Sequence, residues 1–372
     1  MTAKSIFIAA TGQNVGKTTV SLGIFAGLKK RLGRVGFLKP VGQQHVEVEP
    51  RICVDKDVIL IKKHFNLDTP WQQMSPVMIP AGFTRSFLDG HENQILLKEK
   101  ITVSYRALCE QNDFVLIEGT GHVGVGSILG MNNARIAKQL GAEILIVASG
   151  GLGSSIDELA LNIALCREIG VKIKGVILNR VLEDKKEMIL EYFPKALAMW
   201  GIPLLGMLPY TELLNSPAIR DFENLFHTPV ITGEKYRERH FANIRLVAGS
   251  LEDYYLEEVP NQLVITPACR EDIIEAVMAQ HTKMQRGHNI NLEGGIILTG
   301  NTPPSDHLLT KLKAVEIPTL YARMCSFEAM KKIATFTAKI RVEDTLKVQG
   351  AIALIEEHLN FDLLCESVNN IC

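Results

Sequence analysis

Near its N-terminus this chain reads Thr11-Gly12-Gln13-Asn14-Val15-Gly16-Lys17-Thr18-Thr19, a segment that indicates its architecture. It follows the apolar run Ile6–Ala10 and precedes a helical pattern, which is the strand, loop and helix order of a phosphate-binding loop. Small residues let backbone N–H groups point at phosphate oxygens, and the positive end of the following helix adds to the attraction. We therefore predict that all nine residues bind the phosphates of a nucleotide, namely ATP.

Two side chains of this loop have specific expected tasks. Lys17 is expected to reach the β- and γ-phosphates and to act in catalysis, while the Thr18 hydroxyl is expected to hold Mg²⁺. The consensus has glycine five residues before Gly16, where this chain has Thr11, with Gly12 one place later. We interpret the loop as a variant, because its flanking strand and helix disfavour a simple glycine turn with a solvated lysine.

Composition narrows the class of protein. The chain has 372 residues, 47% of them hydrophobic, which is enough for two or three packed domains. Its 40 basic and 41 acidic residues nearly cancel, so bulk charge predicts neither nucleic-acid nor membrane binding. Seven cysteines without a Cys-x-x-Cys pair argue against disulfide or zinc frameworks. No apolar stretch reaches a membrane span of about 18 residues, so we predict a cytoplasmic protein.

Up to about residue 210, short apolar runs alternate with helical patterns. This alternation predicts an α/β fold with a doubly wound, mostly parallel sheet, in which ligands bind beyond the carboxyl ends of the strands. The predicted strands are Ser5–Ala10, Val35–Pro40, Phe114–Glu118, Glu143–Ser149, Lys174–Asn179 and Pro203–Met207. The predicted helices are Thr18–Arg31, Ala134–Leu140, Ile156–Ile169 and Lys185–Trp200, and Ser155 to Glu158 is interpreted as a capping box.

The alternation is lost over residues 211–235, which we predict to be a linker between domain 1–210 and a smaller α/β domain at 236–372. The strands expected in the second domain are Ile244–Gly249, Gln262–Thr266, Gly295–Thr299 and Thr319–Ala322. Its expected helices are Glu271–Gln280, Ser305–Leu312 and Ser326–Ala334, followed by one or two closing helices at 343–370.

Charged residues follow the predicted strands of the first domain. Pro40 ends the second strand and leaves Lys39 facing the expected phosphates, where a second cation could stabilise charge on a γ-phosphoryl group. Asp55 and Asp57 open the next helix, and either could reach Mg²⁺ or act only as a cap, with Asp57 preferred. Glu118 ends an apolar strand before a glycine turn, the position of a metal-binding carboxylate.

Asn179 stands at the end of a further strand, where its amide could contact an adenine edge; the alternative is a turn former. In this order the motifs resemble dethiobiotin synthetase, over about residues 3–210. They are the loop at 11–19, Lys39-Pro40-Val41, Asp57, Glu118-Gly-Thr-Gly, Asn179-Arg180 and Gly201–Pro209.

The resemblance implies that Lys17 and Thr18 bind triphosphate and Mg²⁺ and that Lys39 contacts the reacting phosphate. It also implies that Asp57 and Glu118 bind the metal and that Asn179 contacts adenine. The chain departs from that family at Gln13-Asn14, where the family has a Thr-Glu pair.

Segments of the second half, 261–274 and 294–300, resemble the DRTGG domain, although that tetrad is not literally present. The whole arrangement is similar to the N-terminal half of long bacterial phosphate acetyltransferases, in which these two domains precede the catalytic domain. The chain ends about where that catalytic domain would begin, so we expect no acetyltransferase activity from it alone.

Two functions are compatible with these patterns. The favoured one is a regulatory, nucleotide-sensing protein whose second domain acts by dimerisation or by contact with a protein partner. The alternative is an ATP-dependent ligase that activates a carboxylate substrate, as dethiobiotin and cobyrinate synthetases do, with Arg85 in segment 68–90 as the substrate candidate. A partitioning or division-site ATPase is disfavoured, because the extra lysine of those proteins falls at Gly12 here.

Overall fold

The computed structural model describes residues 3–256, 259, 261–285 and 294–366. The chain divides into two units: unit 1 is Met1–Thr211 with Ile340–Cys372, and unit 2 is Glu212–Lys339. This division differs from the predicted boundaries in two ways. Residues 340–372 join the first unit, and the predicted linker at 211–235 belongs largely to the second. Unit 2 is therefore an insertion within the chain of unit 1.

The centre of unit 1 is a six-stranded sheet in the order β10-β9-β8-β1-β7-β2, and every neighbouring pair is parallel. Strand order reverses at β1, which confirms the predicted doubly wound α/β fold. The register places Phe7 beside Ile117 and Ile144 beside Ile173. The strands are β1 (Lys4–Ala10), β2 (Val35–Leu38), β7 (Phe114–His122), β8 (Glu143–Ser149), β9 (Ile173–Val181) and β10 (Leu204–Pro209).

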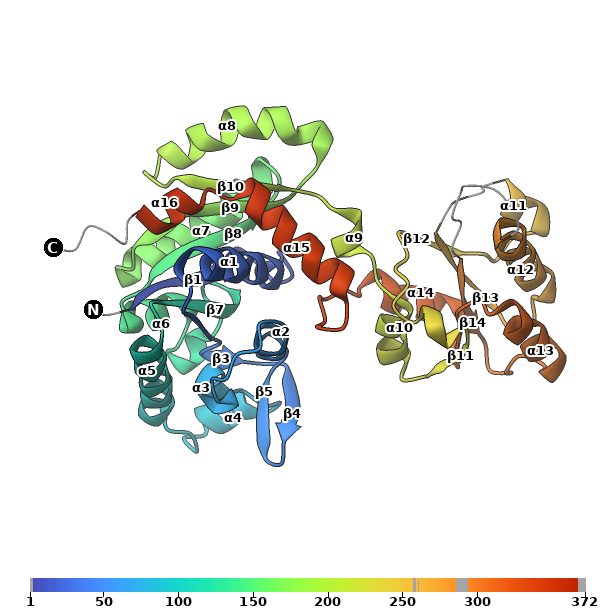
Figure 1. Ribbon diagram of the computed structural model, residues 1–372, viewed down its shortest axis with the longest axis horizontal. Coiled ribbons are helices and arrows are strands. Elements are labelled where there is room, and N and C mark those ends of the chain that lie inside the picture. The colour runs from blue at the N-terminus through green and yellow to red at the C-terminus, as the bar shows by residue number, and fades with distance from the viewer. Residues whose placement is uncertain (1–2, 257–258, 260, 286–293, 367–372) are drawn as a thin grey trace. The chain divides into compact units, whose positions relative to one another are not determined.

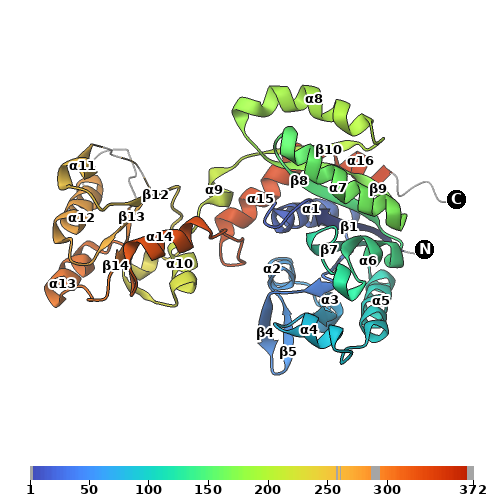
Figure 2. The same ribbon diagram turned by 180° about the vertical axis from the view of Figure 1, so that it is seen from behind.

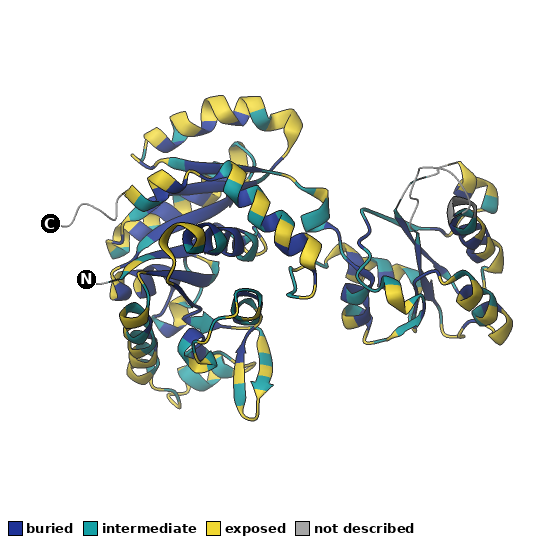
Figure 3. Cartoon of the chain, in the orientation of Figure 1, coloured by how far each residue is buried: buried dark blue, intermediate teal, exposed yellow. Residues whose placement is uncertain are grey.

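Helices cover both faces of this sheet, and its central strands are buried (Figures 1, 2 and 3). One face carries α1 (Lys17–Leu32), α15 (Thr345–His358) and α16 (Phe361–Glu366). The opposite face carries α5 (Gln94–Gln111), α6 (Asn133–Leu140) and α7 (Gly153–Ile169). Helix α8 (Lys186–Ala198) precedes β10, and short 3₁₀ turns span Ser127–Leu129 and Glu183–Lys185.

The closing helices pack closely against α1 because two residues on that side of α1 are glycines. A Cβ atom at Gly23 would lie 2.3 Å from Ile355, and one at Gly27 would lie 2.1 Å from the Phe361 ring. Arg31 then donates two hydrogen bonds of 2.9 Å to the Glu356 carboxylate. This contact places α15 and α16 in unit 1 and corrects their assignment to the second domain. Residues 367–370 of the predicted closing segment lie outside the described residues.

The segment between β2 and α5 contains the helix expected after Asp55 and several small elements that were not predicted from the sequence. Two short parallel strands, β3 (Val41–Gly42) and β6 (Val77–Met78), pair with each other. The antiparallel hairpin of β4 (His45–Glu49) and β5 (Ile52–Asp55) lies between them in sequence. The helices of this segment are α2 (Lys56–His64), α3 (Trp71–Met74) and α4 (Phe83–Leu88).

Unit 2 has a five-stranded sheet in the order β11-β15-β14-β13-β12, with β11 antiparallel to β15 and the other pairs parallel. Helices α10 and α14 bury one face, and α11, α12 and α13 bury the other. The strands are β11 (Val230–Thr232), β12 (Asn243–Leu246), β13 (Gln262–Pro267), β14 (Gly295–Thr299) and β15 (Thr319–Ala322). The helices are α9 (Glu212–Asn215), α10 (Ile219–Phe226), α11 (Leu251–Tyr255), α12 (Glu271–Gln285), α13 (Asp306–Val315) and α14 (Ser326–Ala334), with a 3₁₀ turn at Glu234–Tyr236.

The predicted linker is ordered because it supplies apolar side chains to this core. Phe222 on α10 is fully buried beside Leu263 and Ile297 of the sheet. Helix α10 was not predicted because it lies between two turn signals, Asn215-Ser216-Pro217 and Thr228-Pro229.

Candidate functional site

The loop of residues 11–19, for which nucleotide binding is predicted, joins the end of β1 to the start of α1. Its turn needs left-handed backbone, with φ of 57° at Asn14 and 100° at Gly16. The Asn179 amide Nδ2 donates to the Val15 carbonyl over 2.8 Å, and a Cβ at Gly16 would lie 2.1 Å from that nitrogen. Gly16 is therefore required both by its conformation and by the close approach of Asn179.

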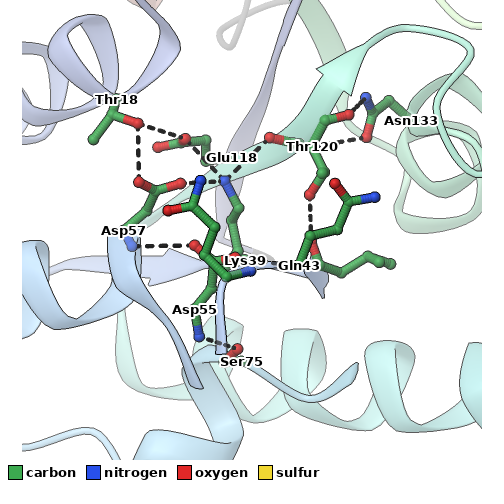
Figure 4. A network of polar contacts seen from close by, with 12 residues as sticks. Thr18, Lys39, Gln43, Asp55, Asp57, Ser75, Glu118, Thr120 and Asn133 are labelled. Atoms are coloured by element: carbon green, nitrogen blue, oxygen red, sulfur yellow. Dashed lines mark hydrogen bonds and ion pairs between the residues drawn. The ribbon is translucent and has the colours of Figure 1, made fainter. Parts of the chain in front are cut away.

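Four polar side chains meet at the N-terminus of α1 (Figure 4). The Lys39 ammonium lies 2.5 Å from Asp57 Oδ2 and 3.0 Å from Glu118 Oε1, and it also donates to the Gly119 carbonyl over 3.3 Å. The Thr18 hydroxyl lies 3.0 Å from Asp57 Oδ1 and 3.3 Å from Glu118 Oε1. Residues separated by up to 100 positions in the sequence thus form one network, which we call the charge cluster: Thr18, Lys39, Asp57 and Glu118.

Lys39 and Glu118 of the charge cluster are buried, and Thr18 and Asp57 are partly buried. Side-chain exposure is 4% for Lys39, 1% for Glu118 and 16% for Asp57. Burial first, and then the Asp57 charge, raise the pKa of the Glu118 carboxyl to about 7 despite the opposing effect of Lys39. Burial lowers the pKa of the Lys39 ammonium, but Asp57, Glu118 and Asp55 outweigh burial and raise it above its usual value. Lys39 is therefore a permanent cation.

The two aspartates that open α2 have different surroundings. Asp55 is the N-cap: its Oδ1 accepts from the Asp57 N–H, and its Oδ2 accepts from the N–H groups of Gln43 and Gln44. These bonds tie Asp55 to the backbone before the hairpin, while burial and Asp57 raise the pKa of its carboxyl. Asp57 instead points into the charge cluster, as Figure 4 shows. The structure thus separates a capping carboxylate from one positioned beside Thr18 and Glu118.

The chemistry of these side chains suits Mg²⁺, which prefers oxygen ligands and commonly takes one or two carboxylates together with substrate phosphates. Glu118 Oε2 is buried, and within the described residues it has no hydrogen-bond partner. An unpaired buried carboxylate oxygen is costly, so the atom has capacity for a further ligand. In the described part of the chain, no group of three or more His, Cys, Asp or Glu side chains could hold a metal. A metal here would depend on Thr18, Asp57, Glu118 and the nucleotide.

Asn179 lies under the loop and not apart from it. Besides its bond to Val15, its Oδ1 accepts from the Arg180 N–H over 3.0 Å, and Arg180 has a left-handed φ of 61°. Both ends of the amide are thus engaged in shaping the loop and its own turn. The predicted contact with adenine stays a prediction, as do the nucleotide contacts of the other loop residues.

Two residues of α7 that hold the loop were not predicted from the sequence. The Thr11 hydroxyl donates to Glu158 Oε2 over 3.0 Å, and Asn162 Nδ2 donates to the Thr11 carbonyl over 3.2 Å. Asn162 Oδ1 also accepts from the Val123 N–H in the turn after β7. The signal was the pair of polar residues at i and i+4 on a mostly apolar helix.

The capping box predicted over Ser155 to Glu158 is wrong. Helix α7 begins earlier, at Gly153, and the Ser155 hydroxyl donates to the Ser149 carbonyl over 2.6 Å. Glu158 therefore does not cap the N-terminus of α7, and its carboxylate accepts the hydrogen bond from Thr11 instead.

Arg85, the predicted substrate candidate, is exposed on α4. In the residues that the structure describes, no helix is long and apolar enough to cross a membrane.

Two families match this chain. The family described as AAA domain matches residues 4–218, which is more than half of the chain, and the DRTGG domain matches residues 224–336. The second match coincides closely with unit 2 and excludes the closing helices, in agreement with their packing in unit 1.

The curated relatives of this chain include both kinds of protein that its motifs resemble, phosphate acetyltransferases and dethiobiotin synthetases. A phosphate acetyltransferase of Pseudomonas aeruginosa is 26% identical over 97% of this chain and 51% of its own length. An ATP-dependent dethiobiotin synthetase of Clostridium kluyveri is 27% identical over 49% of this chain and 76% of its own length. These matches confirm the resemblances predicted from the motifs. The chain spans about half the length of the phosphate acetyltransferases that it matches.

Among solved structures, the MinD cell division protein of Aquifex aeolicus is similar with a TM-score of 0.37 and 18% identity, over 56% of this chain and 83% of MinD.

Proposed function

This chain belongs to the AAA domain family, and we propose that it binds ATP with Mg²⁺ at the charge cluster of unit 1 and works as a regulatory, nucleotide-sensing protein. The observation that carries the proposal is the burial of Lys39, Asp57 and Glu118 around Thr18, at the N-terminus of the loop's helix. Burying charges carries a desolvation cost, and strongly perturbed buried charges of this kind occur preferentially at functional sites.

The residues of the site have distinct proposed roles. Backbone N–H groups of the loop and Lys17 bind the phosphates, and Asn179 keeps the loop in its left-handed turn. Thr18, Asp57 and Glu118 hold Mg²⁺, which when bound neutralises phosphate charge. Lys39 supplies a second fixed positive charge beside the γ-phosphate.

A regulatory role needs a route by which the nucleotide state reaches unit 2. Helix α15, where the chain returns from unit 2, packs directly on α1, the helix whose first residue is Lys17. Gly23 and Gly27 let the two helices approach closely, and Arg31 pairs with Glu356. A shift of α1 on binding phosphate would therefore move α15 and the chain that leads to unit 2.

The ligase alternative requires a pocket for a carboxylate substrate. Arg85 is exposed on α4, and an exposed arginine does not by itself form such a pocket. Regulation without rapid turnover is therefore our proposal. A homodimer, a protein partner and a cytoplasmic location remain predictions from the sequence.

Phosphorus NMR of the protein with excess MgATP tests the first part of the proposal. We expect the triphosphate resonances to broaden and shift on binding, with negligible release of phosphate over hours, and we expect Lys17→Ala to abolish the shift. Sustained release of ADP and phosphate by the wild type would contradict the sensor and favour the ligase.

Hydrogen exchange tests the route to unit 2. MgATP should slow amide exchange in α1 and also in α15, whereas α8, which does not face the loop helix, should be unchanged. Slower exchange in α1 without any change in α15 would contradict the proposed relay while leaving nucleotide binding intact.

A further inference from the structure

We propose that Lys39 is a resident cation of the metal site: its ammonium keeps free divalent cations out, so that the metal enters only together with a triphosphate. This inference rests on the proposed MgATP function and adds a selectivity to it. It concerns the charge cluster before any nucleotide has bound.

The position of Lys39 is fixed from both ends. Its backbone N–H donates to the Met74 carbonyl over 2.8 Å, and Pro40 follows it at the end of β2. Its side chain is 4% exposed, so the ammonium has no path to bulk water without a rearrangement of the site. Salt screens a buried ion pair of this kind only weakly. The lysine is thus a fixed charge and not a mobile surface group.

The ammonium lies where it would repel a metal ion. Mg²⁺ binds oxygen at about 2.1 Å. Lys39 Nζ is 2.5 Å from Asp57 Oδ2, so a metal on that oxygen would lie at most about 4.6 Å from Nζ. The corresponding limit on Glu118 Oε1, which is 3.0 Å from Nζ, is about 5.1 Å. At such distances in a buried site, repulsion between the two cations is strong.

Hydrogen bonding in the charge cluster is nevertheless incomplete. An ammonium has three protons, and Lys39 directs them at Asp57, Glu118 and the Gly119 carbonyl. Thr18 has a single proton, which lies within reach of Asp57 Oδ1 and Glu118 Oε1. Glu118 Oε2 is left without a partner among the described residues. The site therefore has room for one more positive ligand once the repulsion from the Lys39 ammonium is offset.

A triphosphate supplies that offset. Phosphate oxygens held at the N-terminus of α1 bring negative charge next to Lys39, and this charge attracts both the ammonium and the metal. The repulsion that excludes a free metal is thereby compensated. Metal and nucleotide binding should consequently be strongly coupled through one side chain.

Electron paramagnetic resonance of Mn²⁺ tests the inference, because bound Mn²⁺ loses the sharp signal of the free ion. The proteins are the wild type, Lys39→Met, the double variant Lys39→Met with Glu118→Gln, and a control, Lys172→Met, which removes an exposed lysine. Each is titrated with Mn²⁺ alone and with Mn²⁺ plus ATP at pH 8.

With Mn²⁺ alone, we expect Lys39→Met to bind at least about tenfold more tightly than the wild type, since two carboxylates lose their resident cation. The double variant should lose this gain, and Lys172→Met should match the wild type. With ATP present, the wild type should bind Mn²⁺ more tightly than with Mn²⁺ alone.

Equal binding of Mn²⁺ alone by the wild type and Lys39→Met would overturn the inference while MnATP binding persisted. Failure of the wild type to bind MnATP would instead overturn the proposed function. If Lys39→Met does not fold, the wild type decides alone: tight binding of Mn²⁺ without ATP would contradict the exclusion. Thermal unfolding adds a readout, because Mn²⁺ should raise the Tm of Lys39→Met and leave that of the wild type unchanged.

Discussion

Units 1 and 2 share an architecture and differ in what stands at the ends of their strands. In unit 1, Lys39 directly follows β2, and Glu118 ends the apolar part of β7. The Lys39 ammonium lies 3.0 Å from the Glu118 carboxylate in the protein interior. In unit 2, Thr299 at the end of β14 shares a 2.7 Å hydrogen bond with Ser326, a neutral pair. The Lys311–Glu275 ion pair of unit 2 joins two exposed side chains on helices. The same α/β layering therefore gives a buried charged site in one unit and a neutral strand edge in the other.

This difference between the two units indicates that the charge cluster lowers the stability of unit 1, whereas the neutral pair has no such cost in unit 2. Burying two carboxylates and one ammonium costs more than burying hydroxyl groups that bond to each other. Unit 1 should thus depend on its charge cluster, and its stability should respond to pH and ligands in ways that unit 2 does not share.

The largest expected effect comes from removing the cation of the charge cluster. Lys39→Met leaves Asp57 and Glu118 without their buried partner and should lower the free energy of unfolding of unit 1 by about 3–5 kcal/mol. Both tryptophans of the chain, Trp71 and Trp200, lie in unit 1. Urea unfolding followed by tryptophan fluorescence therefore reports on this unit.

The matched control is Lys195→Met, which removes the exposed Lys195–Glu191 pair of α8. It should cost less than about 1 kcal/mol. Equal losses of unfolding free energy in Lys39→Met and Lys195→Met would contradict the expected difference between a buried and an exposed charge.

A smaller loss is expected where the closing helices meet α1. Gly23→Ala would place a methyl group 2.3 Å from Ile355, so unit 1 should lose about 1–3 kcal/mol in the same fluorescence experiment. Gly153→Ala at the start of α7 meets no atom within 4 Å and should be neutral. A neutral Gly23→Ala would argue against the inclusion of α15 in unit 1.

A further expected effect is a pH dependence of the stability of unit 1. The Glu118 pKa rises from 4.5 in the unfolded chain to about 7 in the native state. The native carboxyl therefore keeps a proton that the unfolded chain releases. Its stabilising contribution is fully present below pH 4.5 and is lost as the pH rises through about 7.

The decline of stability over this pH range should flatten in Glu118→Gln, leaving a residual slope from Asp55, whose pKa burial also raises. Glu191→Gln, an exposed carboxyl on α8, is the control. A slope as steep in Glu118→Gln as in the wild type would show that another group titrates.

Sequence patterns predicted the parts of this fold that depend on local signals. Buried parallel strands are continuous apolar runs, and the ranges Glu143–Ser149, Gly295–Thr299 and Thr319–Ala322 agree with the structure to the residue. The closing helices were predicted, but their partner was not. Gly23 and Gly27 indicate that another segment packs closely on α1, but they do not indicate which segment it is.

The candidate site shows the same division. Lys39 and Glu118 could be proposed from their positions after strands, since such ends meet at one edge of the sheet, and Asp57 from its position at a helix start. Their mutual pairing depends on side-chain geometry and was not predictable. Glu158 and Asn162 were missed because their contact with Thr11 spans about 150 residues of sequence.

The most direct test of the account is calorimetric titration of MgATP into the wild type, Lys17→Ala and Lys311→Ala. We expect one site per chain and wild-type affinity in Lys311→Ala of unit 2. Binding in Lys17→Ala should be at least about tenfold weaker, which equals about 1.4 kcal/mol. Unchanged affinity in Lys17→Ala would contradict the central claim that the loop and charge cluster of unit 1 form the nucleotide site.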